Sequence, residues 1–303
     1  MDAIRLPTAS PTLRARLFVA MQYLLPQHFL SRQVHRLARC RVRPVKNALI
    51  GSFVRHFRPD MSDAADPEPR DYPSFNAFFT RSLRPGARPC DPDPRALVSP
   101  VDGTVSQIGR LEGRNLLQAK GHQYSLEALF GGASGWAERF AGGSFATLYL
   151  APFNYHRIHM PAGGTLRAAW FIPGKLFSVN AATAAAVPRL FARNERVICA
   201  FEEGGLAFAL ALVGALFVGS IATVWHGDVT PCSPHRAAQL PLDTARAPAR
   251  LDRGAELGRF NMGSTVILLL PRGAADWLPG LQPGSPVRVG QTLARLRSSR
   301  SGP

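Results

Sequence analysis

From residue 72 onward the chain is a succession of short apolar runs that glycine and proline interrupt. Runs of this length, either alternating with polar residues or continuously apolar, are typical of β-strands. They predict strands over 145–151, 165–172, 196–201, 266–270 and 292–296. Helices are expected over 126–130 and over part of 179–192. The pattern therefore predicts an α+β fold with a mostly β core and a few short helices.

The stretch from Gly204 to Trp225 contains no charged residue over 22 positions, which is long enough for a membrane-spanning helix. Glycines at 204, 205, 214 and 219 divide it into strand-length pieces. Many of the residues between them are β-branched and favour strands. We therefore expect two buried strands here rather than a helix that crosses a bilayer.

The N-terminal segment, residues 1–58, has a different pattern. Leu13, Leu17, Leu24 and Phe29 fall near one face of a predicted helix, and arginines lie elsewhere around it. The segment contains eleven basic residues and one acid, and its longest apolar run is too short to span a bilayer. We expect a basic amphipathic, helical membrane-associating segment. The alternatives are a helix that packs its apolar face on the core and an organelle transit peptide.

Composition divides the rest of the chain. Residues 59–71 carry five acids interspersed with prolines, which indicates an exposed linker before a catalytic domain over 72–303. Ser74 is expected to cap a helix in which Phe75, Phe78, Phe79 and Leu83 share one face. The net charge of +16 implies an acidic partner, and the four scattered cysteines argue against a disulfide framework.

A possible reactive centre lies at the Gly263-Ser264-Thr265 sequence, directly before the apolar run 266–270. A tight turn into a buried strand is the ordinary interpretation of such a sequence. The alternative is that the Ser264 hydroxyl attacks the carbonyl of Gly263, its own upstream peptide bond. Glycine would help this reaction because it leaves that carbonyl sterically open and tolerates strained backbone.

Two histidines three residues apart, His156 and His159, lie between Pro152 and Pro161. A metal site is not expected, because no Asp, Glu or Cys lies close by in sequence to complete the ligand set. Either ring could serve a structural hydrogen bond. The functional interpretation is that one histidine moves a proton near pH 7 while the other faces a substrate.

Asp102 lies in a turn bounded by Pro100 and Gly103. Most such aspartates satisfy only their own turn, but a carboxylate can also hold a histidine in the tautomer that acts as a base. The sequence contains no Gly-x-Ser-x-Gly elbow, phosphate-binding loop or dinucleotide fingerprint. It therefore gives no support to an ordinary serine hydrolase, a kinase or a dehydrogenase.

Several segments together resemble the phosphatidylserine decarboxylase family of the prokaryotic type, in the order found in that family. They cover roughly residues 70–297 and comprise Phe78–Leu83, Ser99–Val105, Lys120–His122, Tyr124–Glu127, Tyr155–Pro161, Phe191–Arg196 and Met262–Thr265. The family more often has leucine where Met262 stands, which is a change of similar volume and polarity.

The resemblance implies a role for each matching residue. Ser264 would become a pyruvoyl group, the covalent cofactor and Schiff-base site, without any metal. His159 would take the serine proton during self-cleavage, and Asp102 would orient His159. His156 would serve the decarboxylation, either by contacting the substrate or by delivering a proton.

The resemblance also implies that the proenzyme splits between Gly263 and Ser264. The products would be a β chain of residues 1–263 and an α chain of residues 264–303, which form a heterodimer that can dimerise further. Bacterial members lie peripherally on the cytoplasmic face of the inner membrane, where the substrate phosphatidylserine and anionic phospholipids would be the partners, and no nucleic acid is expected.

Three alternatives remain at this point. A pyruvoyl enzyme that acts on a soluble amino acid would keep the chemistry and change the substrate. A non-catalytic basic protein bound to a polyanion would keep its chain intact, although no nucleic-acid-binding module is visible. A conventional serine hydrolase would also leave the bond after Gly263 uncut.

Overall fold

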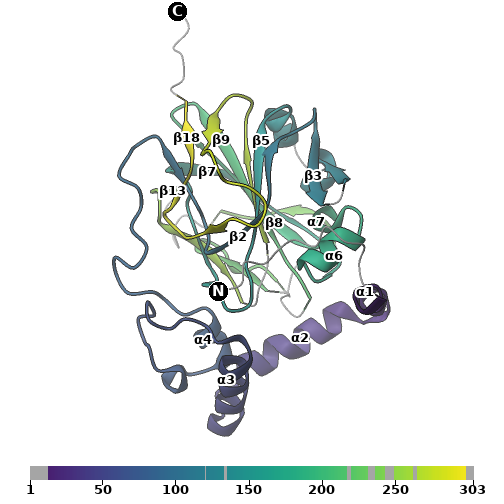
Figure 1. The fold of residues 1–303 in the computed structure, drawn as a ribbon, viewed down its shortest axis with the longest axis vertical. Helices are drawn as coiled ribbons and strands as arrows, with labels where there is room; N and C mark the ends of the chain where they lie inside the picture. The colour runs from purple at the N-terminus through teal and green to yellow at the C-terminus, as the bar shows by residue number, and fades with distance from the viewer. Residues whose placement is uncertain are drawn as a thin grey trace, which may run out of the picture.

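The computed structural model describes residues 13–119, 121–132, 135–216, 220–230, 236–242, 249–261 and 265–297. A large antiparallel sheet forms its centre, and three smaller sheets and short helices surround it (Figure 1). This agrees with the predicted α+β fold and mostly β core. Among the described residues, none of the helices has the length and apolar character needed to cross a bilayer.

The large sheet has nine strands in the described part of the chain, and β13 pairs with β7 beside the main path. Its main path runs β12 (Ala238–Gln239), β7 (Gly164–Ile172), β8 (Arg196–Glu203), β9 (Leu206–Val213), β15 (Thr265–Leu270), β5 (Ser144–Tyr149), β2 (Gly103–Arg110) and β17 (Pro286–Val287), with β13 at Arg250–Leu251. The five strands predicted from apolar runs correspond to β5, β7, β8, β15 and, in a smaller sheet, β18 (Thr292–Leu296).

The smaller sheets are also antiparallel. The site sheet, as we call the four-stranded one, consists of β11 (Gly227–Asp228), β10 (Ile221–Thr223), β14 (Glu256–Phe260) and β6 (Arg157–His159). The others are β1 (Ala96–Val98) with β18 and β16 (Ala275–Trp277), and the hairpin of β3 (Asn115–Ala119) and β4 (His122–Ser125). The uncharged stretch 204–225 contains β9 and β10, as predicted.

Alternation along the central strands divides the core into two clusters. Val266, Leu268 and Leu270 of β15 point toward one apolar cluster, which also includes Ile158 of the site sheet. Ile267 and Leu269 point toward the other cluster, on the opposite face of the sheet. Because both faces are covered by apolar residues, β15 is continuously apolar rather than alternating.

Short helices complete the fold. They are α1 (Leu13–Leu24), α2 (Gln27–Ala38), α3 (Arg43–Phe57), α4 (Phe75–Phe79), α5 (Leu126–Phe130), α6 (Ala181–Ala186) and α7 (Leu190–Arg193), with 3-10 turns at Pro69–Asp71 and Gly135–Phe140. Ser74 caps α4 as predicted, because its hydroxyl accepts a hydrogen bond from the Ala77 N–H at 3.2 Å. The helix ends at Phe79, so the prediction that Leu83 lies on its apolar face was wrong. The predicted helix over 126–130 is α5.

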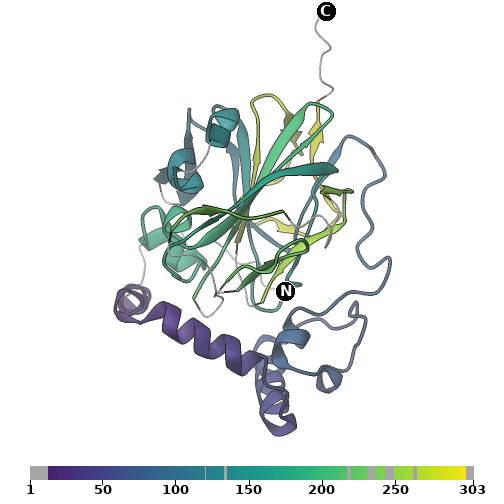
Figure 2. The same cartoon turned by 180° about the vertical axis from the view of Figure 1, so that it is seen from behind.

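The N-terminal helices α1 to α3 form an arm along one end of the β core, and the reversed view shows the same arrangement (Figures 1 and 2). The prediction that Leu13, Leu17, Leu24 and Phe29 share one helical face was wrong. The helix ends before Pro26, and Phe29 lies on a second helix, because proline disfavours the helical conformation of the residue before it.

A small aromatic cluster joins the arm to the core. Phe53 of α3 contacts Phe75, Phe78 and Phe79 of α4 with ring centroids 5.3 to 5.8 Å apart. In the predicted linker 59–71, Ala64 is buried and pairs with Leu83 in an isolated bridge, while most of the acidic residues are partly or fully exposed.

Candidate active site

The predicted cleavage site lies where the chain passes from the site sheet to the large sheet. Strand β14 ends at Phe260, and β15 begins at Thr265. Gly263 and Ser264, together with Met262, lie outside the described residues. The bond that we expect to break therefore belongs to a crossover between two sheets.

The two residues that border this crossover are firmly held. Thr265 is fully buried and pairs with Tyr149 of β5 and Val213 of β9. Asn261 donates from its side-chain amide to Ser220 Oγ at 2.8 Å, and its amide oxygen accepts from Asn76 at 3.2 Å. Its backbone N–H also donates to the Ser220 carbonyl at 3.0 Å.

His159 is the last residue of β6, and both of its ring nitrogens have partners. Nδ1 lies 2.7 Å from the Gly254 carbonyl oxygen, and Nε2 lies 3.0 Å from the Tyr155 hydroxyl. A carbonyl oxygen can only accept, so Nδ1 carries the proton. In the neutral ring Nε2 then has the free lone pair, and Tyr155 donates to it.

The surroundings of His159 favour this neutral form. Burial lowers the pKa of His159 below its ordinary value, although the hydrogen bond to Gly254 and the charge of Glu256 act in the opposite direction. The ring therefore presents a lone pair at Nε2 at neutral pH. This is the state that a general base requires.

Asp102 lies near His159 but forms its hydrogen bonds elsewhere. Arg88 donates to its carboxylate from Nε at 3.0 Å and from Nη2 at 2.6 Å, and the Val289 N–H donates at 2.9 Å. The His159 N–H donates to the Pro100 carbonyl at 2.8 Å, so the turn that contains Asp102 adjoins β6. Among the described contacts, the partners that fix the His159 ring are Gly254 and Tyr155, and an orienting role for Asp102 stays a prediction.

His156 is completely buried against α4. Its ring lies 4.1 Å from the ring of Phe79, measured between centroids, and Nδ1 donates to the Asn154 carbonyl at 2.8 Å. Nε2 is buried and has no hydrogen-bond partner among the described residues. Burial lowers the pKa of His156 to about 3, so this ring is neutral at pH 7 and offers an acceptor.

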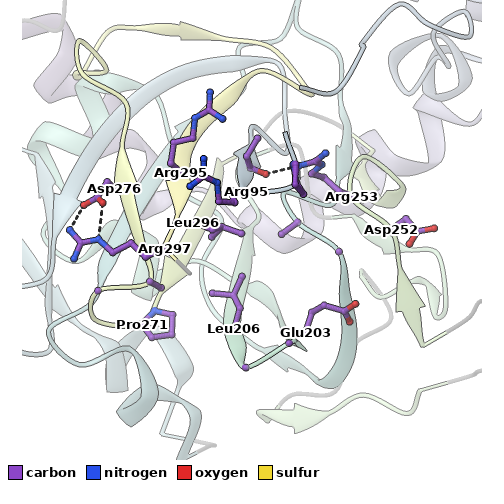
Figure 3. A pocket seen from close by; sticks show the side chains of 18 of the residues that line it. Arg95, Glu203, Leu206, Asp252, Arg253, Pro271, Asp276, Arg295, Leu296 and Arg297 are labelled. Carbon is purple, nitrogen blue, oxygen red and sulfur yellow. Dashed lines mark hydrogen bonds and ion pairs between the residues drawn. The ribbon is translucent and has the colours of Figure 1, made fainter. Parts of the chain in front are cut away.

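A large cleft of the described structure lies away from these residues (Figure 3). It has a volume of 1350 Å³ and is lined by Glu203, Leu206, Pro271 and several arginines. Strands β8 and β9 pair through Glu203 and Leu206 at the end near the cleft. At their other end Arg196 pairs with Val213. Neither Asp102 nor either histidine lines the cleft. In the described part of the chain, no three His, Cys, Asp or Glu side chains are grouped as metal ligands would be.

Comparison with known proteins identifies the family. The model of the phosphatidylserine decarboxylase family matches residues 75–295, and a second model, described as PSD, matches residues 17–58. The chain belongs to the phosphatidylserine decarboxylase family. It is 52% identical to the phosphatidylserine decarboxylase proenzyme of Azotobacter vinelandii over 93% of this chain and 99% of that protein. The proenzyme of Bordetella pertussis is 51% identical over 92% of this chain and 94% of its own length.

A pyruvoyl group made from the chain itself would suit the residues around the crossover. Thr265 Oγ and His156 Nε2 are both buried without a partner among the described residues. The Thr265 hydroxyl can donate a hydrogen bond, whereas His156 Nε2 can only accept one, and buried polar atoms in native proteins are normally satisfied. A carbonyl group only accepts hydrogen bonds, so of these two groups the Thr265 hydroxyl is the one that could bind a pyruvoyl oxygen.

The sequence pointed to some of these residues and missed others. It singled out Asp102, His156 and His159. In the fold, the turn that contains Asp102 lies beside the segment that carries the two histidines. Tyr155 lies in a segment that carried the resemblance but received no role, and no local pattern marked Arg88 as the partner of Asp102. Glu195 also lies in a matching segment, and its burial depends on strands distant in sequence.

Proposed function

We propose that this protein converts phosphatidylserine to phosphatidylethanolamine and CO2 after it has cut its own chain between Gly263 and Ser264. The observation that carries the proposal is the similarity to relatives named phosphatidylserine decarboxylase proenzyme, which are about half identical over more than nine tenths of this chain. The name proenzyme implies that those relatives are processed after synthesis. The geometry around His159 supports the same chemistry here.

In the proposed first step, His159 takes the hydroxyl proton of Ser264 at Nε2. The Gly254 carbonyl fixes the tautomer that leaves Nε2 free of its own proton, and Tyr155 keeps the ring from turning. Asp102, held by Arg88, adds negative charge nearby that favours the imidazolium formed in this step. The carboxylate thereby assists the base through space rather than through a direct hydrogen bond.

The bond changes of self-cleavage follow from the chemistry of serine. Ser264 Oγ adds to the Gly263 carbonyl carbon, and the C–N bond breaks so that an ester replaces the amide. Elimination across the Cα–Cβ bond of residue 264 releases the Gly263 carboxylate. Hydrolysis then releases ammonia and leaves the pyruvoyl group. Strand β15 pairs with β5 and β9 along its length, so the two chains stay associated after the cut.

When present, the pyruvoyl group supplies an electron sink for the electrons released as CO2 leaves the lipid headgroup. His156 acts on the substrate as a hydrogen-bond acceptor, because Nδ1 already donates to Asn154 and Nε2 has only a lone pair. Phe79 packs on the ring and Arg81 lies close enough to oppose its protonation. Burial keeps this part of the site dry and strengthens each polar contact.

The proposal includes peripheral binding to an anionic membrane. Nine of the eleven large apolar side chains that are exposed in the described structure lie between residues 13 and 57. Leu17 is 61% exposed and Leu24 is 87% exposed. The same segment carries most of the excess positive charge of the chain. Apolar side chains surrounded by basic residues are the pattern of helices that lie in a membrane interface.

Intact mass spectrometry of the purified protein, followed by a decarboxylase assay on phosphatidylserine vesicles, tests the proposal. We expect chains of residues 1–263 and 264–303, the smaller one lighter by one ammonia than a peptide that begins with serine. The Ser264→Ala protein is expected to stay a single chain and to release no CO2.

Two outcomes would contradict the proposal. A Ser264→Ala protein that still splits would exclude Ser264 as the attacking group. A split wild-type protein that releases CO2 from free serine but not from phosphatidylserine would establish the soluble amino-acid decarboxylase instead.

A further inference from the structure

Glu195 is a buried acid that the chemistry described so far does not use. Glu195 is 6% exposed, and its carboxyl oxygen Oε1 has no hydrogen-bond partner among the described residues. The backbone on both sides is fixed, since the Glu195 N–H donates to the Lys175 carbonyl and its carbonyl accepts from the Gly214 N–H, both at 2.9 Å. A buried, half-satisfied carboxyl group is costly, and such groups concentrate at functional sites.

The register of the large sheet places Glu195 at the same end as the cleavage crossover. Arg196, the first residue of β8, is opposite Val213 of β9, and Val213 is opposite Thr265 of β15. Neighbouring strands lie about 4.8 Å apart, so Arg196 and Thr265 are separated by about 10 Å across one strand. Glu195 and Ser264 are the residues that precede these two in the chain.

The side chain of Glu195 points to the face that the site sheet covers. Arg196 points to the other face, where it donates to the carbonyls of Ala128 and Leu129. Neighbouring residues in a strand point to opposite faces. The Thr230 hydroxyl, next to the site sheet, acts to lower the pKa of the Glu195 carboxyl group, so the two groups are neighbours on this face.

A set of polar contacts lies between Glu195 and the crossover. The Thr230 hydroxyl is a neighbour of the Glu195 carboxyl group and acts to lower its pKa. The Thr230 carbonyl accepts from Ser220 Oγ at 3.0 Å. Asn261 in turn donates to Ser220 Oγ at 2.8 Å. Asn261 is the last described residue before the cleavage crossover, so Glu195 belongs structurally to the reacting end of the sheet.

The proposed reaction needs a proton donor, and neither histidine is suited to this task. Replacing the carboxylate of the lipid headgroup by hydrogen consumes one proton in each turnover. His156 is neutral at pH 7, because burial lowers its pKa to about 3, and its one N–H is bound to Asn154. Burial likewise keeps His159 unprotonated, with its N–H bound to Gly254.

On the basis of the proposed function, we propose that Glu195 is the acid that protonates the headgroup carbon when CO2 leaves. The bond from that carbon to the carboxylate breaks, and a C–H bond forms at the same carbon. The proton comes from the carboxyl O–H of Glu195, which becomes a carboxylate. Water then returns a proton to Glu195, so each turnover takes one proton from solvent and changes no oxidation state of the protein.

The electrostatic surroundings agree with this role. Burial raises the pKa of Glu195 to about 7, although its hydrogen bond to Thr230 acts in the opposite direction. His28 of α2 is a charged neighbour when it is protonated, with Nδ1 3.8 Å from Oε2, and its ring is exposed. Lys175, whose backbone contacts Glu195, is exposed, and Arg196 points to the other face. An acid whose pKa lies near neutrality can both give up and regain its proton.

Glu195→Gln tests the inference, because it keeps the shape of the side chain and removes the acidic proton. We expect this protein to split into two chains of normal mass, pyruvoyl group included, and to lose about 100-fold in kcat. In the wild-type protein kcat should fall as the pH rises above the pKa of Glu195, and the variant should lack that decline. Glu202→Gln, near the end of β8 that is farther from Glu195, is the matched control with normal kcat.

A second measurement is independent of catalysis. In the unsplit Ser264→Ala protein, the infrared band of a protonated carboxyl group should titrate near neutral pH, and Glu195→Gln should remove that band. Split Glu195→Gln with wild-type kcat and pH profile would overturn the inference, as would an unchanged infrared band. Failure of the wild-type protein to split or to release CO2 would instead overturn the proposed function.

If Glu195→Gln itself does not split, Glu195→Asp replaces it in the kinetic test. This variant keeps an acid on a shorter side chain, so we expect the decline of kcat at high pH to move to a different pH. A decline at the wild-type pH would show that another group donates the proton.

Discussion

A glutamate lies near each end of strand β8, Glu195 directly before its first residue and Glu202 next to its last, and the surroundings of the two differ. Glu195 at one end is buried, and one of its oxygens has no partner among the described residues. Glu202 near the other end is partly exposed and accepts from Arg139 and from Arg167 at 2.9 Å. Burial raises the pKa of Glu195 to about 7, whereas the hydrogen bond from Arg139 lowers the pKa of Glu202.

The same contrast extends over the whole sheet. At the far end, acids and arginines around the cleft of Figure 3 pair with one another, as Asp276 does with Arg297 at 2.7 Å. At the crossover end, buried polar atoms of His156, Glu195 and Thr265 have no partner among the described residues. Unsatisfied buried groups reduce stability, so they persist where a reaction uses them. The large cleft of Figure 3 is therefore a poor guide to the chemistry that we propose.

The largest effect is expected from removing the base at the crossover end. His159→Gln removes the lone pair at Nε2, so self-cleavage should slow at least 100-fold and the protein should be isolated as a single inactive chain. Denaturing gel electrophoresis over time measures this rate. Because burial lowers the pKa of His159, wild-type cleavage should lose speed only at a pH below the ordinary histidine value.

His56→Gln is the control for this experiment, since His56 is an exposed histidine on α3. It should split at the wild-type rate. Splitting of His159→Gln at that same rate would remove His159 from the proposed mechanism and leave Tyr155 and Gly254 with a structural role only.

The sequence was sufficient to predict those elements whose cause is local. Continuous apolar runs predicted β15 and β18, and Ser74 predicted the start of α4, because period and capping are properties of a few consecutive residues. The prediction of a single amphipathic helix was wrong because the helix ends before Pro26 and a second helix begins at Gln27. For the site, the matching segments contain the residues to which we assign the reaction. They could not show that Arg88 binds Asp102, since that contact depends on tertiary packing.

The second effect concerns the helical arm, which lies at the crossover end of the sheet. Replacing Leu17 and Leu24 together by serine removes two exposed apolar side chains, each worth roughly 1.5 to 3 kcal/mol when fully buried in a lipid interface. We expect binding to vesicles that contain phosphatidylserine to fall at least tenfold in a flotation assay, without a change in self-cleavage.

Leu117→Ser is the matched control for membrane binding. Leu117 is an exposed leucine on the β3–β4 hairpin, outside the arm, so its replacement should leave flotation unchanged. An equal loss of flotation in both proteins would mean that exposed apolar area in general, rather than the arm, binds the membrane.

The smallest effect, and the one that sharpens the comparison most, concerns the pH dependence of stability. Because its pKa is lowered in the fold, Glu202 stabilises the protein at a pH above about 4.5, the pKa of the unfolded side chain. This contribution disappears as the pH falls. Solvent screens the pair, so Glu202→Gln should cost less than about 1 kcal/mol at pH 7. The raised pKa of Glu195 has the opposite effect on stability. Its contribution is fully present at low pH and is lost as the pH rises from about 4.5 to about 7.

Thermal unfolding of the unsplit Ser264→Ala protein, measured from pH 4 to pH 8, can separate the two glutamates. A rise of the pKa from 4.5 to about 7 corresponds to roughly 3 kcal/mol, so Glu195→Gln should abolish much of the loss of stability toward high pH. Glu202→Gln should instead lower the melting temperature slightly at pH 7 and not at pH 4. If both variants changed the pH dependence of stability in the same direction, the two glutamates would not differ energetically. The contrast between the buried Glu195 and the ion-paired Glu202 would then be wrong.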